Sequence, residues 1–316
     1  MKVINPISPE TDYKPCVATI GFFDGVHKGH QFLIRLVKQY SKEYGLPAAL
    51  ITFSRPPRQI VQSGYTPQLL TTFDEKIKLL ANTGVEECLL LNFTKEMAGL
   101  SAQAFMSQIL KNKFHVQVLV IGYDHRFGHN RLEGFEDYLN YGKELGIRVV
   151  HAPQYLYKEE KVSSSVIRKI LENGNIKLAT ELLGYSYSLT GTVVEGFHVG
   201  RTLNFPTANM RPDDPFKLIP ERGVYAVWVK LDGKRYMGML NIGTRPTVNN
   251  GSNRTIETHI LHFSQNIYGK RFTIELVERL RSEKKFNSLR DLQDQLEKDK
   301  IQCERILSSM NTVTKN

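Results

Sequence analysis

The stretch that most constrains the fold is residues 21–31, with the sequence GFFDGVHKGHQ. A short apolar run at 17–20 precedes it, and apolar residues at helical spacing follow over 32–40. We therefore predict a buried parallel strand, a glycine-containing loop and a helix, in that order. Such a loop presents free backbone N–H groups and the positive end of a helix, which suits an anionic ligand.

This loop matches neither of two common phosphate-binding patterns. It lacks the Gly-Lys-Ser/Thr ending of the P-loop and the Gly-x-Gly-x-x-Gly pattern of dinucleotide-binding folds. It has instead His27 and His30 at a helix start, where imidazoles can donate to phosphate oxygens and stabilise a leaving pyrophosphate. Gly29 between them is expected to leave room for a nucleotide. The alternatives are two solvent-exposed histidines in a turn, or a metal site formed by the pair.

Length and composition favour a soluble globular protein of two domains, because 316 residues exceed the usual size of one. Apolar runs are too short to cross a membrane, no signal peptide is recognisable, and three scattered cysteines suggest reduced thiols. We therefore expect a cytoplasmic protein without a membrane partner. The net charge of +10 favours phosphate-bearing ligands. Because the basic residues are spread along the whole chain, we expect no nucleic-acid partner.

Residues 1–184 alternate short apolar runs with helical segments. This pattern predicts an α/β domain, a Rossmann-like parallel sheet with helices on both faces. Ligands bind such sheets at the carboxyl ends of the strands, near the switch point. The loop at 21–30 and a second loop at 122–134 both belong to that end, so we expect them to form one site. Asp124, directly after a strand, is expected to face the ligand unless it is an ordinary turn residue.

Three serines open a further predicted helix near the end of this domain. Ser163, Ser164 and Ser165 can cap the helix and offer hydroxyl donors to an anion. Arg168 lies one turn later and can hold a phosphate. The alternative is an ordinary capped helix with no ligand.

Period-two apolar patterns replace this alternation over residues 185–316. They predict a small antiparallel β-barrel, followed by a helix from 288 to about 310. An Asp-Gly pair at 232–233 predicts a tight hairpin turn.

A second glycine-rich loop lies at the start of the predicted barrel. Gly196 and Gly200 let its amides approach phosphates. Thr207 and Asn209 are two residues apart, so on a strand their side chains face one way and offer oxygen ligands to Mg²⁺. A barrel hairpin with a polar edge is the alternative.

Several motifs resemble those of one enzyme family. Residues 21–30, GFFDGVHKGH, resemble the N-terminal motif of bacterial bifunctional riboflavin kinase/FAD synthetases, and the His-x-Gly-His within it resembles the nucleotidyltransferase signature. GYDHRFG at 122–128 and VSSSVIR at 162–168 resemble later motifs of the same domain. GRTLNFPTAN at 200–209 resembles the riboflavin kinase motif. The motifs follow one another in the family's order over nearly the whole chain.

The resemblance implies two successive reactions. The barrel would phosphorylate riboflavin with Mg-ATP to give FMN. The N-terminal domain would then adenylate FMN with ATP to give FAD, with release of pyrophosphate and no covalent enzyme intermediate.

The resemblance also implies residue roles. In the barrel these are general base for Glu257, which would otherwise be a solvated strand residue, and flavin binding for Arg281. The loop of Gly196, Gly200 and Arg201 would bind phosphates, and Thr207 with Asn209 would bind Mg²⁺. In the N-terminal domain the implied catalytic residues are His27, His30 and Arg168, and the implied flavin contacts are Asp124 and Phe127. The implied ATP and phosphate contacts there are Gly21, Phe23, Gly25, Gly29, Ser163, Ser164 and Ser165.

Two positions depart from the family patterns. His125 stands where phenylalanine is usual, which affects a packing contact of its loop. Asn204 stands where glycine is usual, but asparagine tolerates positive φ better than most residues. A chain with only one of the two activities therefore remains an alternative, as does a non-catalytic flavin- or nucleic-acid-binding protein. The sequence leaves the oligomeric state open.

Overall fold

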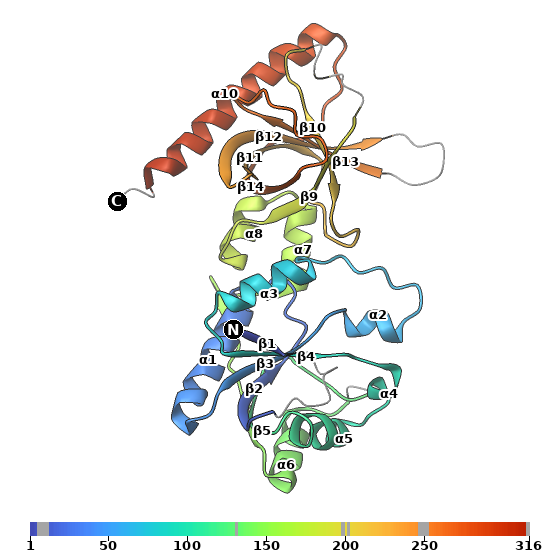
Figure 1. The fold of residues 1–316 in the computed structure, drawn as a ribbon, viewed down its shortest axis with the longest axis vertical. Coiled ribbons are helices and arrows are strands. Elements are labelled where there is room, and N and C mark those ends of the chain that lie inside the picture. Colours follow the sequence, from blue (N-terminus) through green and yellow to red (C-terminus); the bar gives the residue numbers. More distant parts are fainter. Residues whose placement is uncertain (5–12, 130–131, 197–199, 201–202, 246–252, 314–316) are drawn as a thin grey trace. The chain divides into compact units, whose positions relative to one another are not determined.

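Figure 1 shows the computed structural model of the chain, which describes residues 1–4, 13–129, 132–196, 200, 203–245 and 253–313. The chain divides into two compact units, Met1–Ser164 and Ser165–Asn316. We describe each unit by itself. Among the helices described, none has both the length and the apolar composition that crossing a bilayer requires.

The first unit is built on a six-stranded sheet of order β1-β4-β3-β2-β5-β6, in which all neighbours are parallel. This confirms the predicted parallel sheet. The chain adds β3 and β4 on one side of β2 and then returns to add β5 and β6 on the other, so the switch point lies between β2 and β5. The strands are β1 (Lys2–Ile4), β2 (Cys16–Ile20), β3 (Ala48–Phe53), β4 (Glu87–Leu91), β5 (Val116–Ile121) and β6 (Arg148–His151).

Helices cover both faces of this sheet. They are α1 (Lys28–Tyr44), α2 (Pro57–Val61), α3 (Phe73–Ala81), α4 (Lys95–Ala98), α5 (Ala102–Phe105), the π-helix η1 (Met106–Lys111) and α6 (Phe135–Leu145). A short hairpin of β7 (Leu156–Tyr157) and β8 (Glu160–Lys161) follows the sheet.

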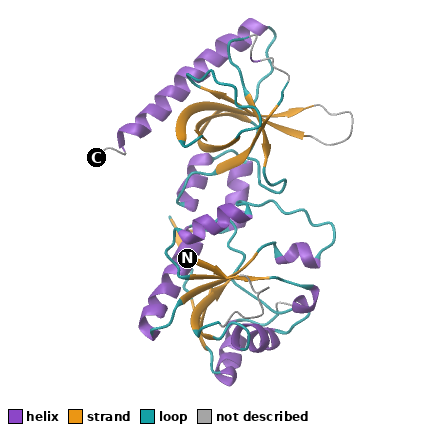
Figure 2. Cartoon of the chain, in the orientation of Figure 1, coloured by secondary structure: helices purple, strands orange, loops and turns teal. Residues whose placement is uncertain are grey.

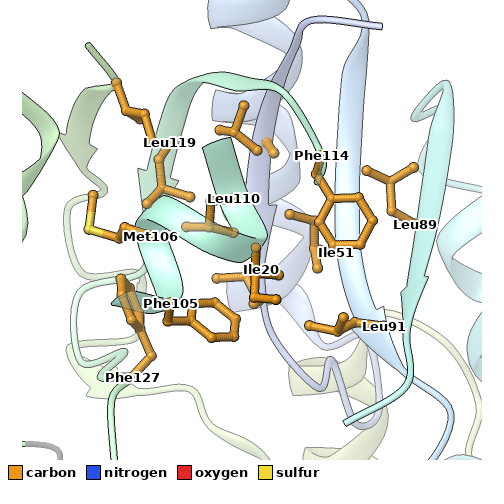
Figure 3. Packing of buried hydrophobic residues seen from close by; sticks show 14 of the residues in the cluster. Ile20, Ile51, Leu89, Leu91, Phe105, Met106, Leu110, Phe114, Leu119 and Phe127 are labelled. Atoms are coloured by element: carbon orange, nitrogen blue, oxygen red, sulfur yellow. The ribbon is translucent and has the colours of Figure 1, made fainter. Parts of the chain in front are cut away.

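Successive side chains along each strand point to opposite faces of the sheet, so the core of the first unit has two layers. On β3, Ala49 and Ile51 face a cluster that contains α5, η1 and α6 residues, whereas Leu50 faces the cluster of α1 and α3. Figure 3 shows the first of these layers, with Phe105 and Leu110 packed beside the strand residues. Both layers consist of buried apolar side chains, and such close-packed layers make the sheet a rigid support for the loops at its carboxyl edge.

The second unit contains a closed antiparallel barrel of order β10-β13-β12-β11-β14-β9, as predicted. Figure 2 shows its strands curling into the barrel, with a long helix as the last element of the chain. The barrel strands are β9 (Ser188–Val194), β10 (Ala208–Pro212), β11 (Gly223–Leu231), β12 (Lys234–Arg245), β13 (Asn253–Ile260) and β14 (Arg271–Arg281), and the helices are α7 (Ser164–Glu172), α8 (Ile176–Leu183) and α10 (Leu289–Val313).

Helices α7 and α8 pack with the barrel. Lys177 on α8 forms an ion pair of 2.8 Å with Glu278 on β14, and Glu221 N donates to Leu171 O of α7 over 3.0 Å. The two compact units therefore divide at Ser164, whereas the sequence analysis placed these helices in the first domain. At the other side of the barrel, α10 contacts β11, β12 and β14.

Candidate active sites

The loop after β2 has an unusual backbone. Phe23, Gly25 and Val26 all have positive φ, of 55°, 79° and 36°. A β-branched residue rarely adopts such a φ, so Val26 is held there by its surroundings at a cost in energy. Strain of this kind at the carboxyl edge of a parallel sheet, beside the switch point, marks the loop as a candidate ligand site.

Asp24 fixes the shape of this loop. Its buried carboxylate accepts hydrogen bonds from Leu70 N over 2.9 Å and from Thr71 N over 3.1 Å. Its backbone carbonyl accepts from the Ser164 hydroxyl over 2.9 Å. Ser164, predicted to donate to a phosphate, thus uses its proton to join the loop to the start of α7. The sequence analysis did not identify the role of Asp24.

His27 and His30 lie together at the start of α1. His27 caps the helix and accepts from His30 N over 3.3 Å, and the two rings stack with centroids 3.6 Å apart. His27 is 4% exposed, so the alternative of two solvated turn histidines is wrong. The described residues contain no group of three or more His, Cys, Asp or Glu side chains that could hold a metal ion, so a metal site on this pair lacks further ligands of these types.

Gly29 lies in a narrower space than expected. A Cβ there would come within 3.1 Å of the His27 ring and 3.3 Å of Val162 O. The absence of a side chain therefore lets the imidazole and the segment before α7 approach the helix start. The sequence analysis had expected that space to be left for a nucleotide.

The imidazole of His30 is held in its neutral form. Burial lowers its pKa well below the usual value, and the positive charges of His27, Lys76 and His125 lower it further. Its Nδ1 atom is buried and has no hydrogen-bond partner among the described residues. A neutral imidazole in this place can donate one N–H to a phosphate oxygen.

A buried lysine that the sequence analysis missed lies beside this pair. Lys76 on α3 is 2% exposed, and its Nζ donates to Phe22 O over 3.2 Å and to Phe53 O over 2.6 Å. Burial lowers the pKa of its ammonium to about 8, while the charges of Asp24 and Cys88 act in the opposite direction. Lysine on a short helix usually indicates a solvated surface, so no pattern in the sequence points to this one.

The second loop of the first unit carries Asp124 and Phe127. Asp124 is largely exposed and forms an ion pair of 2.5 Å with Lys161 on β8. Burial acts to raise the pKa of Asp124, but the hydrogen bond and charge of Lys161 outweigh it, so the pKa is lowered. Phe127 is buried and stacks on Tyr138, with ring centroids 4.2 Å apart. Asp124 is therefore accessible to a ligand, whereas Phe127 supports the loop from the core.

The remaining residues predicted for the first site divide between the units. Gly21 donates from its backbone N to Ile51 O over 3.0 Å, and a Cβ there would crowd the Phe23 ring. Ser163 belongs to the first unit, and Ser165 and Arg168 on α7 belong to the second.

The barrel brings three polar side chains into one row. Glu257 on β13 lies directly opposite Asn209 on β10 and Asn241 on β12, so the three side chains share one face of the barrel wall. Thr207 Oγ1 donates to Glu257 Oε2 over 3.4 Å. The residues predicted as base and metal ligands thus lie side by side, and the strand register adds Asn241 to them.

Two glycines allow the loop before β10 to approach this row. A Cβ on Gly196 would come within 2.1 Å of Asn209 Nδ2, and one on Gly200 within 2.2 Å of Phe205 O. Either substitution would force the backbone apart. Arg201, predicted to bind phosphate in this loop, lies outside the described residues.

A cavity of about 300 Å³ opens beside the row. Its polar lining comes from Gly200, Thr207, Asn241, Glu257, His259, Arg281, Glu283 and Lys284, and its apolar lining from Leu203, Phe205, Val224, Met239, Phe286, Leu292 and Leu296. An apolar cavity with a carboxylate at one side suits a planar aromatic ligand that carries a hydroxyl group. Four of the predicted barrel residues therefore line one cavity.

Arg281 is held at the wall of this cavity by the last helix. Its guanidinium forms a bidentate ion pair with Asp299 on α10, with Nη2 to Oδ2 at 2.8 Å and Nε to Oδ1 at 3.1 Å. Asp299 is 2% exposed and accepts a further bond of 2.8 Å from Gln295. The Asp299 contact was not predicted.

A second cavity of about 340 Å³ lies on the barrel on the other side of Thr207. Thr207, Pro206 and Ala208 line it together with the segment that follows β13. That segment contributes Phe263, Ser264, Gln265, Asn266, Ile267 and Tyr268. Thr207 is thus shared by two cavities, which places its hydroxyl between two possible ligands.

Comparison with known families agrees with this division of the chain. A family model described as FAD synthetase matches residues 10–166, and one described as riboflavin kinase matches residues 183–307. A bifunctional riboflavin kinase/FMN adenylyltransferase of Haemophilus influenzae is 38% identical over 285 residues, which cover 90% of this chain and 92% of the relative. The chain belongs to the bifunctional riboflavin kinase/FMN adenylyltransferase family.

Other members of this family are similar over almost their full length. The enzyme of the same name from Escherichia coli K12 is 35% identical, over 95% of this chain and 96% of its own. That of Bacillus subtilis is 36% identical, over 93% of each chain. A crystal structure from Streptococcus pneumoniae, named a macrolide-efflux protein, is 31% identical and superposes with a TM-score of 0.85, covering 94% of this chain and 97% of that one.

Proposed function

We propose that this chain makes FAD from riboflavin in two ATP-dependent steps. The barrel unit phosphorylates riboflavin to FMN, and the nucleotidyltransferase unit adenylates FMN to FAD with release of pyrophosphate. The observation that carries this proposal is the cavity in which an apolar wall, Glu257, Thr207 and Arg281 lie together. The names of the relatives point to the same pair of reactions.

In the kinase reaction, the flavin ring occupies the apolar cavity and its ribityl chain extends to the polar row. Glu257 accepts the proton of the terminal hydroxyl as that oxygen attacks the γ-phosphorus of ATP. The bond from the γ-phosphorus to the β–γ bridging oxygen breaks, and ADP leaves with the electron pair. ATP occupies the cavity on the other side of Thr207, so the two substrates meet at that residue. Phosphoryl transfer depends mainly on positioning and on charge stabilisation, and the loop of Gly196 and Gly200 supplies amides for the phosphates.

The oxygens of Thr207, Asn209 and Glu257 fit a Mg²⁺ ion. They are hard ligands on one face of the wall, and they are few, as is usual for an ion that also binds substrate phosphates. When bound there, Mg²⁺ would neutralise charge on the β- and γ-phosphates. Thr207 and Asn209 would hold it, and Gly196 allows the phosphate-binding loop to lie against the Asn209 amide.

In the adenylyl transfer, a phosphate oxygen of FMN attacks the α-phosphorus of ATP. The bond from that phosphorus to the bridging oxygen breaks, and pyrophosphate leaves with the electron pair. His27 and His30, together with the amides of the strained loop, stabilise the charge that develops on the phosphates. Ser163 contributes a further donor, and Asp124 orients the flavin or nucleotide. Ser165 and Arg168, which belong to the second unit, stay predicted phosphate ligands.

We assign residues 1–184 to the adenylyltransferase and 185–316 to the kinase, because the FAD synthetase model matches residues 10–166 and the riboflavin kinase model matches residues 183–307. We place the chain in the cytoplasm, since Cys16, Cys88 and Cys303 are buried free thiols. Its partners are the small molecules riboflavin, FMN and ATP, with no nucleic acid and no membrane.

Two single substitutions test this assignment in the full-length protein. His30→Ala should abolish FAD formation from FMN and ATP while total flavin phosphorylation from riboflavin is unchanged. Glu257→Gln should do the reverse, lowering flavin phosphorylation by about 10²–10⁴-fold, as expected for a lost general base. Each variant is expected to keep one of the two activities, and that retained activity shows that the variant has folded. Equal loss of both activities in either variant would contradict two separate sites.

A further inference from the structure

Lys76 joins two neighbouring strand ends beneath the candidate adenylyltransferase site. Its Nζ donates to the carbonyl of Phe22, in the loop after β2, and to that of Phe53, at the end of β3. The same ammonium lies 4.1 Å from the centroid of the Phe22 ring, a cation–π contact. The strained loop that leads to His27 is therefore attached to the sheet through this one side chain.

The segment before and within α3 holds the loop at two points. Asp24 of the loop accepts from Leu70 N and Thr71 N, just before α3, and Lys76 reaches back to the loop from the second turn of that helix. An anionic group and a cationic group thus attach the same loop to one segment. The two attachments fix the direction in which the loop enters α1, where His27 and His30 lie.

Burying this ammonium is costly, which argues against a purely stabilising role. No carboxylate forms an ion pair with Lys76 within the described residues, and two carbonyls are weaker partners than a carboxylate. The depressed pKa of Lys76, about 8, reflects this burial; Asp24 and Cys88 face it and partly offset the effect. An apolar residue of similar size would avoid that cost.

The charge of Lys76 also acts on His30. It is one of the groups that lower the pKa of His30, after burial and the charge of His27, and together with His125. A neutral His30 still has one ring N–H that it can donate to a phosphate oxygen. A fixed cation behind the histidines also adds to the attraction for the triphosphate.

We propose that Lys76 is a positioning residue for adenylyl transfer, which holds the loop of residues 21–27 on the sheet and so fixes where His27 and His30 lie. This inference rests on the proposed function of the first unit. It adds a residue that acts through the loop, without contact with the reacting atoms.

Three full-length variants test the proposal. Lys76→Gln keeps a donor but loses the charge, Lys76→Arg keeps the charge, and Lys78→Gln removes an exposed lysine from the same helix as a control. We expect Lys76→Gln to lower FAD formation from FMN by about 10²-fold, the effect of a misplaced catalytic group, with unchanged riboflavin phosphorylation. Lys76→Arg should recover most of this loss, and Lys78→Gln should match the wild type.

The pKa of His30, followed by NMR of histidine-labelled protein, provides a readout that does not require activity. It should rise in Lys76→Gln and stay at its wild-type value in Lys76→Arg. Wild-type values of both the pKa and the FAD rate in Lys76→Gln would overturn the proposal. So would loss of a folded spectrum in Lys76→Gln and also in a fourth variant, Lys76→Met, which places an apolar side chain of similar size there. If the wild-type protein makes no FAD, the proposed function is refuted instead. The effect of Lys76→Gln on the pKa of His30 can then still be measured independently.

Discussion

Asn204 shows how one residue can depart from a family pattern and keep its geometry. It stands where the related motif has glycine, and its φ of 63° is in the left-handed region, as the sequence analysis expected. It lies in a turn in which Leu203 N and Phe205 N both donate to Gly200 O, over 3.2 and 2.8 Å. Because asparagine adopts this φ at little cost, the turn before the polar row is retained.

A substitution at Asn204 tests this account of the turn. Asn204→Val should lower the free energy of unfolding of the second unit by about 1–2 kcal/mol, since a β-branched residue is strained at positive φ. Asn204→Gly should leave it unchanged or slightly higher. Trp228, the single tryptophan of the chain, is buried on β11, so its fluorescence during urea unfolding reports on the barrel. A valine variant as stable as the glycine variant would contradict the account.

Elements with a strong pattern were predictable from the sequence, and contacts that depend on register were not. The apolar run of β2 and the Asp-Gly turn at 232–233 appear as predicted, since each depends on local preferences. The hairpin of β7 and β8 was missed because two-residue strands carry no periodicity. The π-helical turn η1 carries no signal of its own in the sequence, since π-helical and α-helical turns have similar sequence patterns.

The same distinction applies to the sites. His27, His30, Thr207 and Glu257 were found from motifs that are local in sequence. Lys76, Asn241 and Asp299 were not, because burial of a lysine, alignment of three strands and docking of a helix are tertiary events. Sequence pattern therefore located the groups proposed to do the chemistry, and the structure added those that hold them in place.

The ion pair of Arg281 and Asp299 joins α10 to the wall of the cavity proposed to bind the flavin. Asp299→Asn should lower the free energy of unfolding of the barrel by about 3 kcal/mol. This value is at the lower end of the range for breaking a buried ion pair, because the Arg281 side chain keeps 21% of its surface exposed. It should also raise the KM for riboflavin, since Leu292 and Leu296 of α10 line the cavity. Urea unfolding followed by Trp228 and initial-rate kinetics measure the two effects. Asp294→Asn, at an exposed position of the same helix, is the control and should change neither.

At the scale of the whole molecule, the account assigns each reaction to a different compact unit. The parallel sheet offers a switch point with a strained loop and two stacked histidines, which suits transfer of a nucleotidyl group. The barrel offers an apolar cavity with a carboxylate beside a glycine-containing loop, which suits phosphorylation of a hydroxyl group on an aromatic ligand. FMN, the product of the reaction assigned to the barrel, is the substrate of the reaction assigned to the parallel-sheet unit.

The most direct test is chromatography of the flavins formed when the pure full-length protein is incubated with Mg-ATP. With riboflavin as the starting flavin, we predict that FMN appears first and FAD follows; with FMN, FAD should form without delay. Accumulation of FMN alone would contradict the role given to His27 and His30. No conversion of either flavin would contradict the central claim and leave a protein that binds flavins without transforming them.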